Sequence, residues 1–103
     1  MCFIGMAWTT HVDATWVFAL TPKDVRSQGE TGQVSFRTVE PLVNPAGCNN
    51  IDYYGILPGN NPNSRLALLL SAYLMRKRID IYIHNTGCDM WGRPRVTDVR
   101  IRD

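Results

Sequence analysis

Cysteine and histidine are the residues of this chain best suited to covalent or metal chemistry. The three cysteines are an odd count, so at most one pair can form a disulfide within the chain. Cys48 and Cys88 each follow a glycine and each lie just outside a predicted strand, which favours a bridge between them and leaves Cys2 without an obvious partner. Two other interpretations stay open: idle thiols in a reducing cytosol, or a zinc site built from Cys48, Cys88 and His84.

A catalytic role would need a nucleophile beside an oriented base, and the candidate bases are His11 and His84. His84 could meet Cys88 across a turn, although a histidine at a strand end is more often a solvated or capping residue. Asp80 and Asp98 fall on outward positions of amphipathic strands, where we expect them to aid solubility. Neither a glycine-rich phosphate loop nor a His-Glu-x-x-His run occurs. We therefore predict no catalytic residues, no cofactor and no metal, and so a protein that is not an enzyme.

Aromatic residues near arginine and asparagine indicate a binding surface. We predict a ligand site at one rim of a small β-barrel, made of Tyr53, Tyr54, Tyr82, Trp91 and Arg93. Such a set suits a sugar, because the C–H face of a sugar ring stacks on an aromatic ring while its hydroxyls take directed hydrogen bonds. The alternatives are that Trp91 is a structural plug over the disulfide and that one of Tyr53 and Tyr82 belongs to the core.

The length and composition indicate a single globular domain over 1–103. Of the 103 residues, 45% are hydrophobic and 19% are charged, which is not the composition of a disordered chain. The net charge of +2 is too small to hold a polyanion unless the basic groups cluster on one face, so nucleic acid is not the expected partner. No apolar run is long enough for a membrane span. The apolar start, 1–7, reads as either a trimmed leader or a first strand.

Alternating hydrophobicity predicts several strands that would position these residues. The ranges are 12–20, 33–39, 51–57, 79–84 and 96–102. Between the first two, Thr21-Pro22-Lys23-Asp24 predicts a turn, and the polar run 26–32 with two glycines predicts a loop.

One helix is predicted between Asn61 and Lys77, with Asn61 as N-cap and Pro62 at the first helical position. The basic run 76–78 closes it, where cations complement the helix dipole. A wide apolar stripe is expected to face the sheet: Leu66, Leu69, Leu70, Tyr73 and Leu74. Leu68, Ala72 and Met75 make the helix apolar on a second side, so either the sheet covers the helix completely or this second side meets another subunit, and we predict the interface.

The order of elements, with a cysteine-bearing loop on each side of the helix, resembles a known family. The run Leu69-Leu70-Ser71-Ala72-Tyr73-Leu74, leading through Lys77 into Ile79-Asp80-Ile81-Tyr82-Ile83, is similar to the small OB-fold B subunits of the subtilase-cytotoxin and pertussis-like toxin group and their small secreted relatives. The resemblance spans roughly 32–103. It implies a five-stranded, partly open barrel capped by one helix, a Cys48–Cys88 bridge, cyclic association as in the toxin pentamers, and binding of cell-surface glycans. No glycan-contacting residue of those toxins matches a motif here.

Together these patterns predict a mainly β fold with one α-helix, of the α+β class. The expected function is non-enzymatic recognition of a glycan or another small polar ligand by a homo-oligomer, secreted or periplasmic if the cysteines are bridged and cytoplasmic if they are not. One alternative is an OB-fold protein that binds single-stranded nucleic acid through Arg93, Arg95, Arg100 and Arg102. Another is an orphan domain of a mobile gene cassette, or a structural partner whose helix docks on a larger protein.

Overall fold

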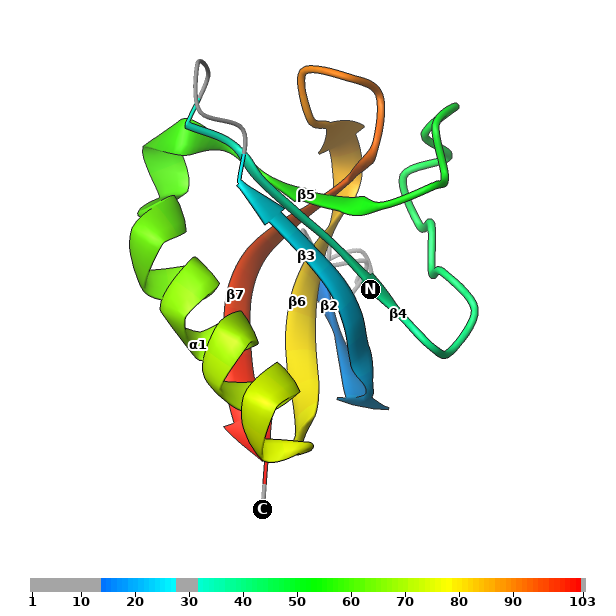
Figure 1. The fold of residues 1–103 in the computed structure, drawn as a ribbon. Helices are drawn as coiled ribbons and strands as arrows, with labels where there is room; N and C mark the ends of the chain where they lie inside the picture. The colour runs from blue at the N-terminus through cyan, green and yellow to red at the C-terminus, as the bar shows by residue number, and fades with distance from the viewer. Residues whose placement is uncertain (1–13, 28–31, 103) are drawn as a thin grey trace, which may run out of the picture.

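The computed structural model describes residues 14–27 and 32–102, which form one sheet and one long helix (Figure 1). The elements are β2 (Ala14–Leu20), β3 (Pro22–Ser27), β4 (Val34–Thr38), β5 (Tyr54–Ile56), a short 3-10 helix (Pro58–Asn60), α1 (Pro62–Met75), β6 (Arg78–Cys88) and β7 (Pro94–Arg102). The predicted fold class, mainly β with one α-helix, is confirmed. The interpretation of 1–7, the first residues of the strand predicted at 12–20, and both Cys2 and His11 lie outside the described residues.

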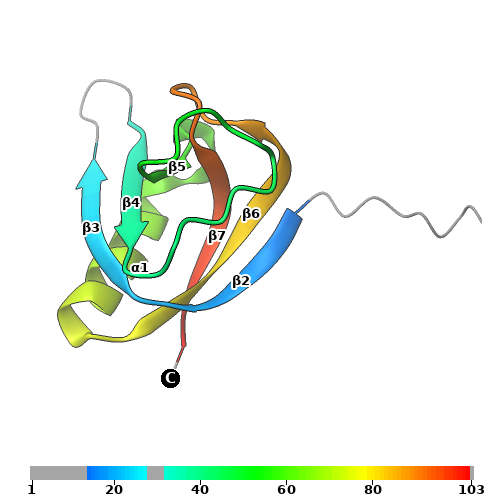
Figure 2. The same ribbon diagram turned by 90° about the vertical axis from the view of Figure 1, so that its right-hand side faces the viewer.

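The strands form a six-stranded sheet in the order β2-β6-β7-β5-β4-β3. Neighbouring strands are antiparallel except β5 and β7, which are parallel and share the register pair Gly55 and Arg95. Thr21 alone separates β2 from β3, so one bent segment supplies both edges of the sheet, as Figure 2 shows. The sheet therefore curls around its core without closing into a barrel, whereas the resemblance implied a partly open barrel of five strands.

The segment after Thr21 corrects the sequence prediction, because Pro22–Ser27 is a strand and not a turn and loop. It pairs antiparallel with β4 from Pro22 opposite Thr38 to Ser27 opposite Val34. Proline is tolerated as the first residue of an edge strand, where no ladder hydrogen bond needs its missing N–H. Pairing with β4 therefore overrides the local sequence preference for a turn. In the other direction, the strand predicted at 51–57 is reduced to Tyr54–Ile56.

The helix is present over Pro62–Met75 and has proline at its first position, as predicted. Asn61 does not cap it through its side chain; it adopts left-handed backbone angles, and its carbonyl accepts hydrogen bonds from Ser64 N at 3.2 Å and Arg65 N at 3.5 Å. At the other end Arg76 is left-handed (φ 56), and Lys77 N donates to Ala72 O at 2.9 Å. In the described part of the chain, no helix is long and apolar enough to cross a membrane.

The helix packs on β3 and β7 through a narrow face, which differs from the predicted stripe (Figure 1). Leu69 and Ala72 are fully buried and Leu66 is partly buried. The solvent side exposes the large apolar residues Leu68, Leu70, Tyr73, Leu74 and Met75. The sequence stripe was therefore wrong for Leu70, Tyr73 and Leu74, and Ala72 belongs to the core of this chain and not to an interface. Periodicity could not choose a side because the helix is apolar all round.

The core lies between α1 and the inner face of the curled sheet. Its fully buried members include Phe36, Tyr54, Ile56, Leu69, Ile79, Ile81, Ile83 and Val96. Arg65 of α1 connects the helix to β7. Its Nε and Nη2 donate hydrogen bonds to Thr97 O at 3.1 and 2.7 Å. The guanidinium thus satisfies a strand carbonyl on β7 beyond the parallel pair.

Asp80 is the second correction, because it is only 1% exposed and does not serve solubility. Its Oδ1 accepts a hydrogen bond from Ala19 N at 2.9 Å, at the bulge where β2 changes register, and Oδ2 accepts one from Arg100 Nε at 2.8 Å. Arg102 Nε lies 3.4 Å from Oδ1. Burial raises the pKa of Asp80, but these partners outweigh it and hold the pKa below its usual value. Asp98, by contrast, is exposed as predicted.

Candidate functional site

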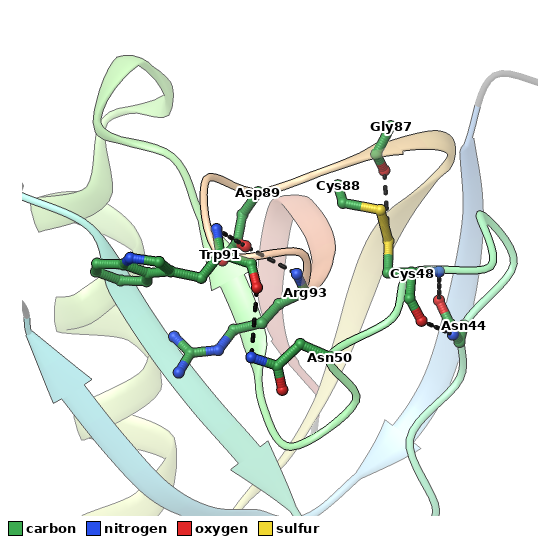
Figure 3. The surroundings of a disulfide bond; sticks show 8 residues. All are labelled: Asn44, Cys48, Asn50, Gly87, Cys88, Asp89, Trp91 and Arg93. Carbon is green, nitrogen blue, oxygen red and sulfur yellow. Dashed lines mark hydrogen bonds between the residues drawn. A yellow bond between two sulfur atoms is a disulfide. The ribbon is translucent and has the colours of Figure 1, made fainter.

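The predicted disulfide between Cys48 and Cys88 is confirmed, with the two Cα atoms 5.9 Å apart (Figure 3). It joins the long segment between β4 and β5 to the end of β6. Asn44 secures the same segment, since its Oδ1 accepts from Cys48 N at 2.8 Å and its Nδ2 donates to Cys48 O at 2.9 Å. Because both sulfurs are used in the bridge, the zinc and free-thiol interpretations of this pair are set aside.

The loop from Asp89 to Arg93 is shaped by one buried carboxylate. Asp89 Oδ1 accepts hydrogen bonds from Trp91 N and Arg93 N, each at 2.8 Å, while Oδ2 accepts one from Gln33 Nε2. Asp89 N also donates to Arg93 O at 2.9 Å. Gly55 leaves the room for this carboxylate, because a Cβ there would lie 2.0 Å from Asp89 Oδ2. The loop geometry is therefore set before any ligand arrives.

Trp91 projects from this loop on the side away from the disulfide, and its side chain is accessible (Figure 3). The residue is 39% exposed, which argues against its role as a plug over the bridge. Asn50 faces it: Asn50 N donates to Gly92 O at 2.9 Å, and Asn50 Nδ2 donates to Trp91 O at 3.3 Å. Together with Arg26 and Arg93, these residues line a shallow pocket of about 410 Å³. We call this pocket, with Tyr53 beside it, the Trp91 site.

Tyr53 gathers the positive charges of the site around one ring. The Cζ atoms of Arg26, Arg37 and Arg93 lie 4.4, 4.9 and 5.3 Å from the centre of its ring, within the range of cation–π attraction. Its hydroxyl donates to Asp24 Oδ2 at 2.7 Å. This hydrogen bond lowers the pKa of Asp24, with Arg37 helping at 3.0 Å, and raises the pKa of Tyr53.

Arg93 serves mainly to connect the loop with the sheet, since it is 7% exposed. Its Nε lies 3.1 Å from Asp52 Oδ1, and its Nη1 donates to Ser35 Oγ at 3.0 Å. The guanidinium also sits 5.2 Å from the Trp91 ring. Arg26 differs, because among the described residues no carboxylate lies within ion-pair distance of it. Arg26 is thus the cation of the site that is most available to a ligand.

The structure brings together Tyr53, Trp91 and Arg93 of the five predicted ligand residues and separates the other two. Tyr54 is fully buried, and Val43 N donates to its hydroxyl at 2.8 Å; burial raises its pKa. Tyr53 directly precedes β5; its ring contacts the arginines of the site, whereas Tyr54 belongs to the core. Tyr82 lies on another part of the sheet, with its ring 5.0 Å from that of Trp16. Neither Tyr54 nor Tyr82 therefore lines the Trp91 site.

Arg26, Arg37, Asp24 and Asn50 were missed by the sequence prediction. Arg26 and Asp24 fell in a segment predicted to be a turn and loop, although they lie on β3, opposite Ser35 and Arg37 of β4. Arg37 lies within the strand predicted at 33–39, but nothing in that pattern linked it to the site. No spacing in the sequence links residue 50 to residue 91.

No family model, no curated protein and no solved structure matches this chain. The chemistry of the site is therefore inferred from its geometry. The arrangement offers an exposed indole face, a guanidinium without an ion-pair partner among the described residues, and an amide. The amide oxygen of Asn50 has no hydrogen bond from the described residues. This set can hold a flat or ring-shaped polar molecule by stacking and directed hydrogen bonds. In the described part of the chain, no group of side chains is arranged to hold a metal ion.

Proposed function

We propose that this chain is a non-enzymatic recognition module that binds a saccharide, or another small polar ligand, at the Trp91 site. The observation that supports this most strongly is the preset loop: a buried carboxylate fixes the backbone on both sides of an accessible tryptophan. A binding site that is formed before the ligand arrives avoids the entropy cost of ordering a loop.

In this proposal the apolar face of one sugar ring stacks on Trp91. Arg26 donates to a hydroxyl or ring oxygen, and the Asn50 amide oxygen accepts from a neighbouring hydroxyl. Arg93 supports Trp91 and Tyr53 supports Arg26, since the Arg93 guanidinium lies 5.2 Å from the Trp91 ring and the Arg26 guanidinium lies 4.4 Å from the Tyr53 ring. The shallow pocket fits a terminal sugar and its neighbour better than a buried small molecule, which is usually enclosed on most of its surface.

A glycan array on the full chain, followed by titration of the best binder, tests the proposal. Trp91→Ala is expected to weaken that binding roughly tenfold, since an aromatic stacking partner contributes about 0.5–1.5 kcal/mol beyond the area it buries. Met90→Ala is the matched control, because Met90 is an exposed apolar neighbour in the same loop that does not line the pocket. Equal effects of the two changes, or an array without specific binders, would contradict the proposed function.

We further propose that the module acts as a homo-oligomer assembled through the solvent side of α1. Apart from Arg65, which is turned onto Thr97, no residue of Pro62–Met75 is charged, and Leu74 is 76% exposed. An uncharged helix face of this kind is usually covered in the native assembly. The resemblance noted above supports a cyclic arrangement, which is a pentamer in those toxins.

Light scattering on the purified chain tests the assembly. Leu74→Glu is expected to shift the mass of the particle toward that of the monomer. The fold should not change, because the Leu74 side chain is exposed and is not part of the core of its own subunit. Thr86→Glu, an exposed residue near the end of β6, is the control and should leave the mass unchanged. A wild-type monomer that aggregates alone and becomes soluble with a larger protein would instead favour a hetero-complex.

The disulfide supports a place of action outside the reducing cytosol, in a secreted or periplasmic setting. Alkylation of native protein taken directly from its cells, followed by intact mass measurement, tests this. Recovery of Cys48 and Cys88 as alkylated thiols would contradict it.

A further inference from the structure

The outer face of β2, β6 and β7 carries a second set of aromatic and basic residues, separate from the Trp91 site. Alternation along the strands places Phe18, Arg78, Arg100 and Arg102 on this face, together with Asp80. Arg78 pairs in register with Arg102, and Asp80 with Arg100. We call the four residues other than Asp80 the basic face. In Figure 1 the ends of α1 and β7 and the start of β6 gather at the bottom of the molecule, opposite the 89–93 loop.

Two of these arginines are fixed in place by their surroundings. Asp80 binds the Nε atoms of Arg100 and Arg102 at 2.8 and 3.4 Å, so the terminal nitrogens remain for a ligand. The Arg100 guanidinium lies 4.5 Å from the Trp16 ring, and both guanidinium groups lie 5.9 Å from the Phe18 ring. A planar fork held in this way loses little side-chain entropy when it binds an oxyanion.

Positive charge is concentrated at this end of the molecule. Arg76 and Lys77 end the helix and lead directly into Arg78, and none of the three lies within ion-pair distance of a carboxylate among the described residues. Glu40 is the other nearby acid. Burial raises its pKa, but hydrogen bonds from Thr21 N and Oγ1 at 2.7 and 2.9 Å and the charge of Arg78 hold the pKa below its usual value, so Glu40 offsets part of the charge of Arg78. The whole chain carries only +2, so a local cluster of cations makes this end more positive than the chain as a whole. The low total charge therefore does not by itself exclude a polyanion at this face.

We propose that the basic face binds a sulfated polysaccharide. Sulfate groups match the paired donors of a guanidinium, and the Phe18 ring, 54% exposed, offers a face for one sugar ring. Single-stranded nucleic acid fits less well, because it uses successive free aromatic platforms and Arg100 already covers Trp16. The disulfide also favours a polyanion that occurs outside the reducing cytosol. This site is independent of the proposed saccharide site at Trp91.

Retention of the full chain on heparin, and anisotropy titration with a labelled heparin oligosaccharide, test the proposal. Arg78→Gln is chosen because it leaves Asp80 and its two partners intact. It is expected to weaken binding about fivefold, and Lys77→Gln/Arg78→Gln about 25-fold. These values assume that each cation contributes the same binding free energy as a lysine or arginine beside an anionic membrane surface. Phe18→Ala is expected to weaken binding about threefold. Circular dichroism and thermal melting would verify that each variant folds.

Arg26→Gln is the matched control, because it removes one positive charge from the Trp91 site at the other end of the molecule. It should change heparin binding less than twofold. Equal losses from Arg26→Gln and Arg78→Gln would overturn the proposal, since binding would then follow net charge alone. Tighter binding to a single-stranded DNA oligonucleotide of equal charge, or to vesicles containing phosphatidylserine, at the same salt concentration would also overturn it, in favour of nucleic acid or lipid respectively.

Discussion

The Trp91 site and the basic face are built from the same residue types but are held by different means. At the Trp91 site, three arginines converge on Tyr53 from two strands and a loop, and two of them form ion pairs: Arg37 with Asp24 and Arg93 with Asp52. On the basic face, one carboxylate is buried beneath two arginines that come from the same strand. The loop arrangement produces a pocket and the strand arrangement a flat surface. Position in the fold, more than residue type, therefore decides whether aromatic and basic residues form a pocket or a surface.

The largest effect is expected when the disulfide that holds the loop side is removed. In Cys48→Ser/Cys88→Ser, we expect a loss of about 4 kcal/mol in unfolding free energy on the chain-entropy model, because the bridge closes a loop with a sequence separation of 40. Urea denaturation measures this. Binding at the Trp91 site should weaken, whereas heparin retention should not. Cys2→Ser, which leaves the bridge intact, serves as the control, and a loss below about 1 kcal/mol in the double variant would refute the expectation.

The second largest effect is expected when the buried carboxylate of the sheet side is removed. Asp80→Asn should lower the unfolding free energy by about 3 kcal/mol, because two arginines lose their charge partner and the Ala19 N–H loses a strong acceptor. Asp98→Asn, an exposed aspartate on the adjacent strand, should change it by less than about 0.5 kcal/mol. Similar losses of unfolding free energy in the two variants would show that Asp80 contributes less to stability than its burial indicates.

Acid unfolding sharpens the same point. The folded-state pKa of Asp80 is below its ordinary value, so the unfolded state binds more protons in that range and stability rises with pH. The contribution is fully present above the ordinary aspartate pKa of about 3.9 and is lost as the pH falls through the lower folded value. A stability profile measured from neutral to strongly acid pH should therefore be flatter in Asp80→Asn than in the wild type.

A smaller effect is expected at the contact beneath the loop. Gly55→Ala places a methyl group where Asp89 Oδ2 lies, so the carboxylate must move and its hydrogen bonds to the loop must weaken. We expect a loss of about 2 kcal/mol and a change in tryptophan emission from Trp91. Gly59→Ala is the control, because nothing lies within 4 Å of a Cβ there. An unchanged emission spectrum in Gly55→Ala would show that the loop does not depend on this contact.

The smallest effect concerns the acid at the rim of the Trp91 site. Asp24→Asn should lower the pKa of Tyr53 toward its ordinary value, since the hydrogen bond to the carboxylate is the main cause of the raised pKa. Alkaline absorbance titration measures this, and Tyr53→Phe identifies which step belongs to Tyr53. The raised pKa also means that its stabilising effect is present below the ordinary tyrosine pKa of about 10 and is lost as the pH rises above it.

Many of the helix and strand positions could be predicted from the sequence alone. The alternation at 79–84 and 96–102 identified β6 and β7, and Asn61-Pro62 located the start of α1. The glycines before Cys48 and Cys88 pointed to the pair that forms the bridge. These features depend on neighbours in the chain or on simple periodicity, which is why local reasoning reached them.

The candidate site was readable only in part. Trp91, Arg93 and Tyr53 were predicted, whereas Arg26 and Asn50 were not, because their proximity depends on the pairing of β3 with β4 and on the bridge between distant loops. Asp80 shows the same limit from the other side. An aspartate in an alternating strand looks exposed until the bulge of β2 places an N–H over it.

The sequence by itself determined that this chain forms several strands and one helix with a single charged residue, and that at most one disulfide can form within the chain, since backbone preference, hydrophobic period and cysteine count are local properties. The tertiary structure alone decided which helix face is buried, which arginines surround Tyr53 and which carboxylate lies beneath Arg100 and Arg102. Those outcomes follow from the curl of the sheet, which brings distant strands together. Contacts between distant residues are not encoded in the spacing of any one segment.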